Sequence, residues 1–137
     1  MLYTIDSAAP EVPGDLLTKL SRCRRVLLIE ANDQRRWVGS RVVPEVHIPP
    51  IGLMYVASFA RLNHPDAQIQ ILETSMDARS DEALTAKLLE FGPDMVGIRS
   101  ISLFEDELRR VAGIVKRVLG IPVVAGGPSR PPGAVPF

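Results

Sequence analysis

Two short apolar segments constrain the fold of this chain more than any other feature. Residues 95–98 lead into Ser100, and residues 121–125 lead into Gly126 and Gly127. Each segment is entered through a break that contains glycine and proline. Uninterrupted apolar runs of this length are typical of parallel strands that are buried on both faces of a sheet. Ligands of open parallel sheets bind beyond the carboxyl ends of the strands, so these two exits are the first place to look for a site.

Predicted strands and helices alternate along the chain from residue 25 onward. We expect strands at residues 25–30, 68–72, 95–98 and 121–125, with helices at 49–62, 80–91 and 104–119 between them. Because crossovers between parallel strands are right-handed, this order predicts an α/β fold with a doubly wound parallel sheet. The apolar segment at 25–30 is expected in the centre, and the alternating segment at 68–72 at an edge. The last ten residues contain four prolines, so we expect four strands, with a fifth missing or supplied by a partner.

Length and composition bound the class of protein. The 137 residues suffice for one domain, and we expect an arm with a short helix at 1–24, an α/β domain at 25–128 and a proline-rich tail at 129–137. The chain has 16 Lys and Arg residues and 16 Asp and Glu residues, so its net charge is zero and does not favour nucleic acid as a partner. No apolar run reaches the ~20 residues that span a bilayer. Cys23 is the only cysteine, which excludes an internal disulfide and favours a cytoplasmic location.

The connection at residues 31–49 is the longest between predicted elements. Loops of this length inside compact domains are usually functional, and this one starts at the same predicted sheet edge as Ser100 and Gly126. It lacks the glycine-rich fingerprint of dinucleotide-binding domains. A phosphoacceptor receiver domain is also disfavoured, because the strand at 95–98 ends in Arg99 and Ser100 without an aspartate. Both common phosphate-handling versions of the fold are therefore set aside.

Four segments together resemble a known family. They are PPIGLMYVAS at 49–58, ILE at 71–73, PDMVGIRS at 93–100 and PVVAGGP at 122–128. In order and spacing they are similar to the cobalamin-binding domains at the N-terminus of cobalamin-dependent radical S-adenosylmethionine enzymes. The resemblance covers about residues 25–128. It implies a flavodoxin-like sheet with the corrinoid at the carboxyl ends of the strands.

The resemblance also implies a set of cofactor-binding residues. The residues implied to line the nucleotide-tail slot or to lie under the corrin ring are Asn32, Asp33, Pro50, Ile51, Gly52, Ser100, Ser102, Gly126, Gly127 and Pro128. Hydroxyls can bond the amides and the base nitrogen, and glycines leave room for a wide aromatic base. His47 is the candidate axial ligand to cobalt, hence the metal-binding expectation. Strand-end capping explains the serines equally well, a tight turn is the simpler explanation of the glycines, and a loop histidine is more often solvated.

Two departures from the family pattern limit the chemistry of this chain. The loop after the first predicted strand lacks the cobalt-coordinating histidine motif of the methionine-synthase-like branch, as the radical enzymes commonly do. One cysteine also cannot supply the three-cysteine motif that holds an iron–sulfur cluster. We therefore expect no catalysis of the radical step by this chain alone. The expected function is a corrinoid-binding module that presents the cofactor to a partner or to a catalytic domain, for methyl transfer or related chemistry.

Two alternatives remain open from the residues. The first is a scaffold or interaction protein that keeps the fold without the cofactor and pairs through the helix at 51–60 and the unfinished sheet edge. That helix is apolar on nearly all sides until Arg61, so we expect another element, domain or subunit to cover it. The second is a small enzyme that uses Glu30, Asp33 and His47 as acid and base, although no spacing demands it.

Overall fold

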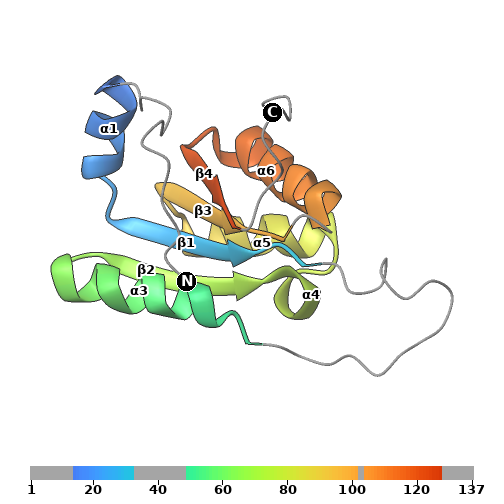
Figure 1. The fold of residues 1–137 in the computed structure, drawn as a ribbon. Helices are drawn as coiled ribbons and strands as arrows, with labels where there is room; N and C mark the ends of the chain where they lie inside the picture. The colour runs from blue at the N-terminus through green and yellow to red at the C-terminus, as the bar shows by residue number, and fades with distance from the viewer. Residues whose placement is uncertain (1–13, 33–48, 102–103, 128–137) are drawn as a thin grey trace, which may run out of the picture.

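A four-stranded, all-parallel sheet forms the centre of the structure (Figure 1). The computed structural model describes residues 14–32, 49–101 and 104–127. The strands are β1 (Arg25–Glu30), β2 (Gln68–Glu73), β3 (Met95–Arg99) and β4 (Val123–Gly126), in the order β2-β1-β3-β4. This is the order of the first four strands of a flavodoxin-like fold, so the predicted fold class is confirmed. The predicted central position of β1 and edge position of β2 are also confirmed.

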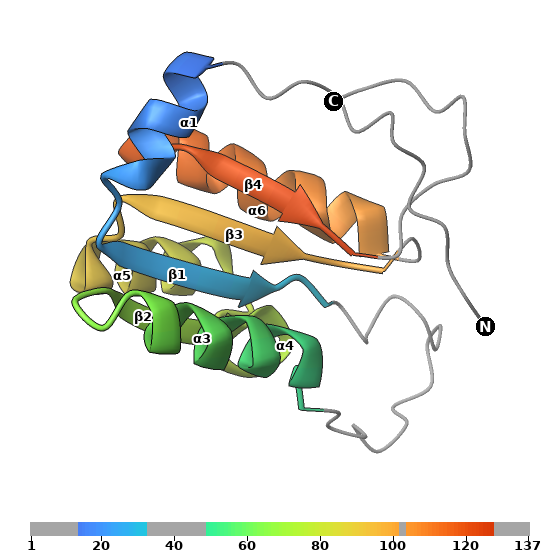
Figure 2. The same cartoon turned by 60° about the vertical axis from the view of Figure 1, so that its left-hand side comes forward.

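Helices cover the two faces of the sheet unequally (Figure 2). Helix α3 (Ile51–Asn63) packs on one face, against β1 and β2. Helices α5 (Asp81–Phe91) and α6 (Glu105–Leu119) pack on the other face and against each other. The larger hydrophobic core lies between the sheet and these two helices, and a smaller core lies under α3. Helix α1 (Gly14–Ser21), expected from the sequence, precedes β1.

Local signals in the sequence set the ends of the helices. The Ser80 hydroxyl accepts a hydrogen bond from the Ala83 N–H and caps α5. Gly92 and Gly120 end α5 and α6 in the left-handed conformation that favours glycine. Pro50 lies at the N-cap position of α3, one residue before the helix rather than in its first turn as predicted. The one-turn helix α4 (Thr74–Asp77) was not predicted, because four residues are too few to show helical periodicity.

The prediction that β3 and β4 are buried on both faces is wrong. Among the described residues, no helix covers the α3 side of these strands, because α3 lies over β1 and β2. β4 is the second edge of the sheet, and its Val124 is 45% exposed. An apolar run therefore indicated a strand but not its position, since an edge strand in this chain is as apolar as a central one.

Candidate functional site

The carboxyl ends of β1, β3 and β4 lie at one edge of the sheet, as the site prediction requires. The Ser100 N–H donates to the Gly126 carbonyl at 3.2 Å, and the Ala31 N–H donates to the Arg99 carbonyl at 2.8 Å. These bonds continue the parallel ladder one residue past the strands. The segments that lead to Asn32, Ser100 and Gly126 are thus neighbours although they are far apart in sequence.

Ser100 holds this edge together through its own side chain. It is buried, and its hydroxyl lies within hydrogen-bond distance of the backbone carbonyls of Ala31 (3.1 Å), Ile101 (3.1 Å) and Phe104 (3.2 Å). One hydroxyl proton can serve only one of these acceptors at a time, so the donor is fully committed to the protein backbone. The geometry corresponds to the strand-end capping role that the sequence left open for Ser100.

Gly126 and Gly127 have different surroundings although they are adjacent. A Cβ atom at Gly126 would meet nothing within 4 Å, so open space lies over this residue. A Cβ atom at Gly127 would lie 2.1 Å from the Ser100 carbonyl oxygen, and Gly127 has φ 129°. Gly127 therefore permits the close passage of the chain beyond β4, and Gly126 leaves free surface.

A row of four residues crosses the α3 side of the sheet at its carboxyl edge. The register pairs Glu73 with Glu30, Glu30 with Arg99, and Arg99 with Gly126. Paired residues of parallel strands point to the same face, so Gly126 shares the α3 side with the charged residues. In the preceding row, Gly97 and Val124 occupy β3 and β4. On the side of β3 and β4 that no described helix covers, open space therefore lies over Gly126, whereas the Leu28 side chain lies against Gly97.

The first turn of α3 lies beside this row. A Cβ atom at Gly52 would lie 3.5 Å from Arg99 Nε, so the helix and the guanidinium are in near contact. Pro50 and Ile51 precede and begin the helix at the same place. The structure therefore brings Pro50, Ile51 and Gly52 to the same sheet edge as Asn32 and Gly126. Of the other implied site residues, Asp33, His47, Ser102 and Pro128 lie outside the described residues.

Sequence reasoning missed the ion pair in this row. Arg99 Nη1 and Glu30 Oε1 are 2.6 Å apart, and the Glu30 residue is only 8% exposed. Within the part of the chain that the structure describes, Glu30 Oε2 and Asn32 Oδ1 are buried without a hydrogen-bond partner. The signal was present in the sequence, since Glu30 and Arg99 both end predicted strands. Their pairing was not inferred, because the residue pattern does not give the register that places Glu30 opposite Arg99.

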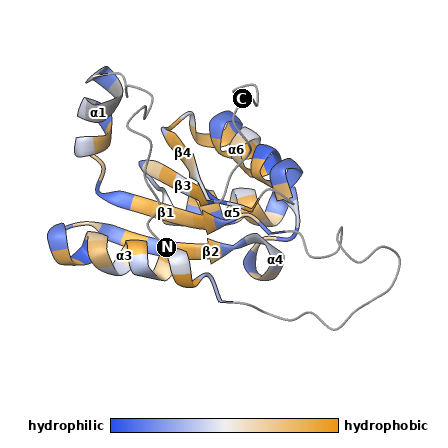
Figure 3. Cartoon of the chain, viewed as in Figure 1, coloured by the Kyte–Doolittle hydropathy of each residue, from blue (hydrophilic) through white to orange (hydrophobic). Residues whose placement is uncertain are grey.

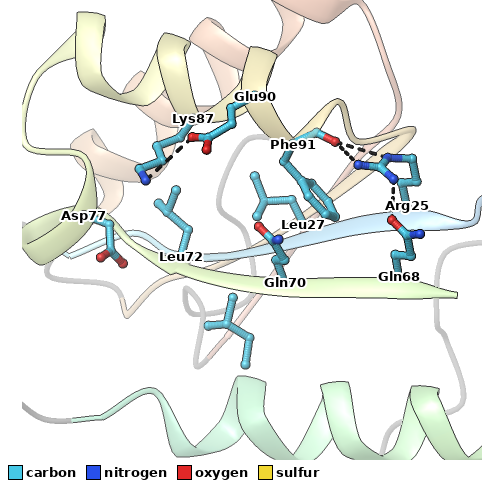
Figure 4. A pocket seen from close by; sticks show the side chains of 10 residues that line it. Arg25, Leu27, Gln68, Gln70, Leu72, Asp77, Lys87, Glu90 and Phe91 are labelled. Carbon is cyan, nitrogen blue, oxygen red and sulfur yellow. Dashed lines mark hydrogen bonds and ion pairs between the residues drawn. The ribbon is translucent and has the colours of Figure 1, made fainter.

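A separate cavity of about 490 Å³ lies on the opposite face, along β2 (Figure 4). Figure 4 shows Gln68 and Gln70 of β2 across from Lys87 and Glu90 of α5. The two charged side chains form a weak ion pair at 3.8 Å. This cavity is polar and shares no residue with the carboxyl-edge row of Glu30, Arg99 and Gly126.

Comparisons with known proteins add no family assignment. The chain matches no family model, no curated protein and no solved structure. In the described part of the chain, no helix has the length and hydropathy to cross a membrane. No cluster of three or more His, Cys, Asp or Glu residues suited to a metal ion occurs among the same residues.

Proposed function

We propose that this chain is a corrinoid-binding module that holds the cofactor at the carboxyl edge of its sheet, on the α3 side. The observation that carries the proposal is the open surface over Gly126, next to strand ends that meet at one edge. A large flat ligand needs close access to backbone, and Gly126, which has no side chain, provides it. The sequence resemblance to cobalamin-binding domains supports the identity of the ligand.

The described residues fit such a ligand at some positions and not at others. Gly126 leaves space at the sheet edge, and Asn32 offers a buried polar atom that has no hydrogen-bond partner among the described residues. Ser100 does not fit the role of a hydroxyl ligand, because backbone carbonyls take its proton. A bound corrinoid would supply cobalt chemistry for methyl transfer or a related reaction. The protein's part is to bind the corrinoid and to orient it for a partner or a catalytic domain. We place the protein in the cytoplasm, because its single cysteine, Cys23, forms no internal disulfide.

Retention of hydroxocobalamin tests the proposal. The purified protein is mixed with hydroxocobalamin and desalted, and the visible spectrum is recorded. We expect retained corrin absorbance in the wild type and its loss in Gly126→Leu, because a leucine would fill the open surface. Gly113→Leu is the matched control, since Gly113 lies on α6, which packs on the opposite face of the sheet from α3, and a Cβ atom there also meets nothing within 4 Å. A colourless wild type, or equal retention by Gly126→Leu with an unchanged circular dichroism spectrum, would refute the proposal.

An interaction role is the second candidate, and the exposed side of α3 favours it. Figure 3 shows apolar residues along this helix. Tyr55 is 75% exposed and Phe59 is 71% exposed, and the other exposed apolar residues of the helix are Ile51, Met54, Val56 and Leu62. Contiguous apolar surface of this kind marks contact sites for proteins. We propose that α3 binds a protein partner or a second copy of this chain.

The free edge at β4 is the second part of this proposed interface. On β2 the outward-facing Ile69 carbonyl accepts from Arg61 Nη2, and the outward-facing Glu73 N–H donates to Asp77 Oδ2, so side chains block that edge. On β4 the alternation of the ladder turns the backbone groups of Val123 and Ala125 outward. Among the described residues β4 is therefore the sheet edge that can accept another strand.

Light scattering after size-exclusion chromatography tests the interaction role. We expect the wild type to self-associate or to bind a protein partner, and Phe59→Ser to reduce self-association. Ala125→Pro would block the β4 edge while it leaves the pairing with β3 intact, and Ala125→Thr is its control because threonine retains the N–H. A monomeric wild type that binds no protein partner contradicts this role.

A further inference from the structure

We propose that Glu30, Arg99 and Asn32 form a recognition site for a primary carboxamide. The inference deepens the proposed corrinoid-binding function and rests on it, since primary carboxamides project from the rim of a corrinoid. It names the chemical group that the carboxyl edge of this domain recognises.

The acceptor side of the site is the buried carboxylate of Glu30. Oε1 accepts from Arg99 Nη1 at 2.6 Å, whereas Oε2 has no partner within the described residues. A buried acceptor without a donor destabilises the folded state, and it does so more strongly when it is charged. A ligand N–H that reaches Oε2 removes this cost. The site is therefore built to accept a hydrogen bond that the described part of the chain does not supply.

Asn32 adds a second acceptor on the same side of β1. Residues 30 and 32 are two apart in extended backbone, so they point to the same face of the sheet, and the intervening Ala31 is buried in the core on the other face. The Asn32 N–H donates to Thr74 Oγ1 at 3.0 Å, and the Thr74 hydroxyl lies within hydrogen-bond distance of the Asn32 carbonyl (3.1 Å) and the Glu30 carbonyl (3.3 Å), so Thr74 holds the backbone of this segment in place. The free Oδ1 therefore sits on a rigid support.

The donor side of the site is Arg99 and the start of α3. The Arg99 side chain is 34% exposed, so the guanidinium is the solvent-facing member of the pair. Only Nη1 has a hydrogen bond to a described residue, which leaves further N–H groups for a ligand. The N–H groups of Gly52 and Leu53 lie in the first turn of α3 and therefore have no acceptor within the helix, and the N-cap residue Pro50 supplies no side-chain cap.

A site that places hydrogen-bond donors beside unpartnered acceptors favours a ligand group that has both an acceptor and a donor. A primary carboxamide presents a carbonyl oxygen to Arg99 and an NH₂ group to Glu30 Oε2. A carboxylate has only acceptors and is repelled by the Glu30 charge. An ammonium group has only donors and is repelled by Arg99. The arrangement therefore favours a neutral carboxamide over either charged group.

Titration with acetamide and with acetate, followed by ¹H–¹⁵N NMR, tests the inference. We expect acetamide to shift the signals of Arg99 and Gly52, with at least about tenfold weaker binding of acetate. Glu30→Gln replaces a free acceptor with an NH₂ donor of the same shape, so the ratio of acetamide to acetate affinity should fall at least about tenfold. Glu82→Gln, an exposed carboxylate on α5, is the control and should leave the ratio unchanged.

The outcomes separate this inference from the corrinoid proposal. Equal binding of acetamide and acetate by the wild type, or shifts far from Arg99 and Gly52, would overturn the carboxamide site even if Glu30→Gln fails to fold. Selective acetamide binding by a protein that retains no hydroxocobalamin would keep the carboxamide site and remove the corrinoid. Hydroxocobalamin that is retained equally by the wild type and by a folded Glu30→Gln variant would keep the corrinoid and remove the site.

Discussion

Substitution of Gly127 by alanine should destabilise the protein much more than the same change at its neighbour Gly126. At Gly127 the new Cβ atom would lie 2.1 Å from the Ser100 carbonyl oxygen, and φ is 129°, a region that side chains disfavour. The strained backbone costs about 1–3 kcal/mol and the overlap costs a further 1–3 kcal/mol. Because β4 is an exposed edge strand, a small shift of its end relieves part of these two costs. We therefore expect a loss of about 2–4 kcal/mol.

Urea unfolding followed by circular dichroism measures this loss. The free energy of unfolding of small proteins falls by about 1–3 kcal/mol per molar urea, so the unfolding midpoint of Gly127→Ala should fall by roughly 1–2 M. Gly126→Ala is the matched control: its φ is not positive and its Cβ atom meets nothing, so a change within about 0.5 kcal/mol is expected. Equal midpoints for the two variants would show that the chain does not pass close to Ser100, and the described geometry of this edge would be wrong.

Three further predictions concern the remainder of the fold. Ser80→Ala removes the cap of α5 and should lower the free energy of unfolding by about 1 kcal/mol in urea unfolding, whereas Ser80→Thr should lower it less. Asp94→Ala removes a carboxylate that accepts from the N–H groups of Arg24 (2.7 Å) and Arg25 (3.0 Å), so thermal unfolding should show a loss of about 1–3 kcal/mol, and Asp94→Asn a smaller one. Burial first, and then the charge of Asp94, raise the pKa of the Cys23 thiol. The folded state therefore binds the proton more tightly than the unfolded state, and stability should decline as pH rises from the ordinary thiol pKa toward the raised one, a decline that Cys23→Ser should remove.

The local sequence was sufficient to predict most helices and strands. The serine at position 80, the glycines at 92 and 120 and the apolar spacing of α6 each act through neighbours within a few residues, so the predicted boundaries hold to within one or two residues. Helix α4 escaped prediction because one turn carries no periodicity. The parallel sheet followed from the alternation of strands and helices, since right-handed crossovers leave few other arrangements.

The parts of the site were predicted less completely. Ser100 and Gly126 lie at the same edge in any parallel sheet that contains both strands. In the structure the Ser100 nitrogen and the Gly126 carbonyl oxygen are 3.2 Å apart. The sequence could not show that the Ser100 hydroxyl is used by backbone carbonyls, because its acceptors come from three separate positions. It also could not distinguish the open space over Gly126 from the tight contact at Gly127.

The sequence by itself determined which segments of this protein become strands and helices and that Ser100 and Gly126 end their strands at the same edge of the sheet, because those properties depend on contacts between near neighbours and on the direction of the chain. Only the tertiary structure decided the register of the strands and the part of the sheet that each helix covers, and with them the pairing of Glu30 with Arg99 and the exposure of Val124. Such contacts join residues about seventy positions apart or depend on which face a helix covers. Their energies arise only when the whole sheet is assembled, so no local pattern records them.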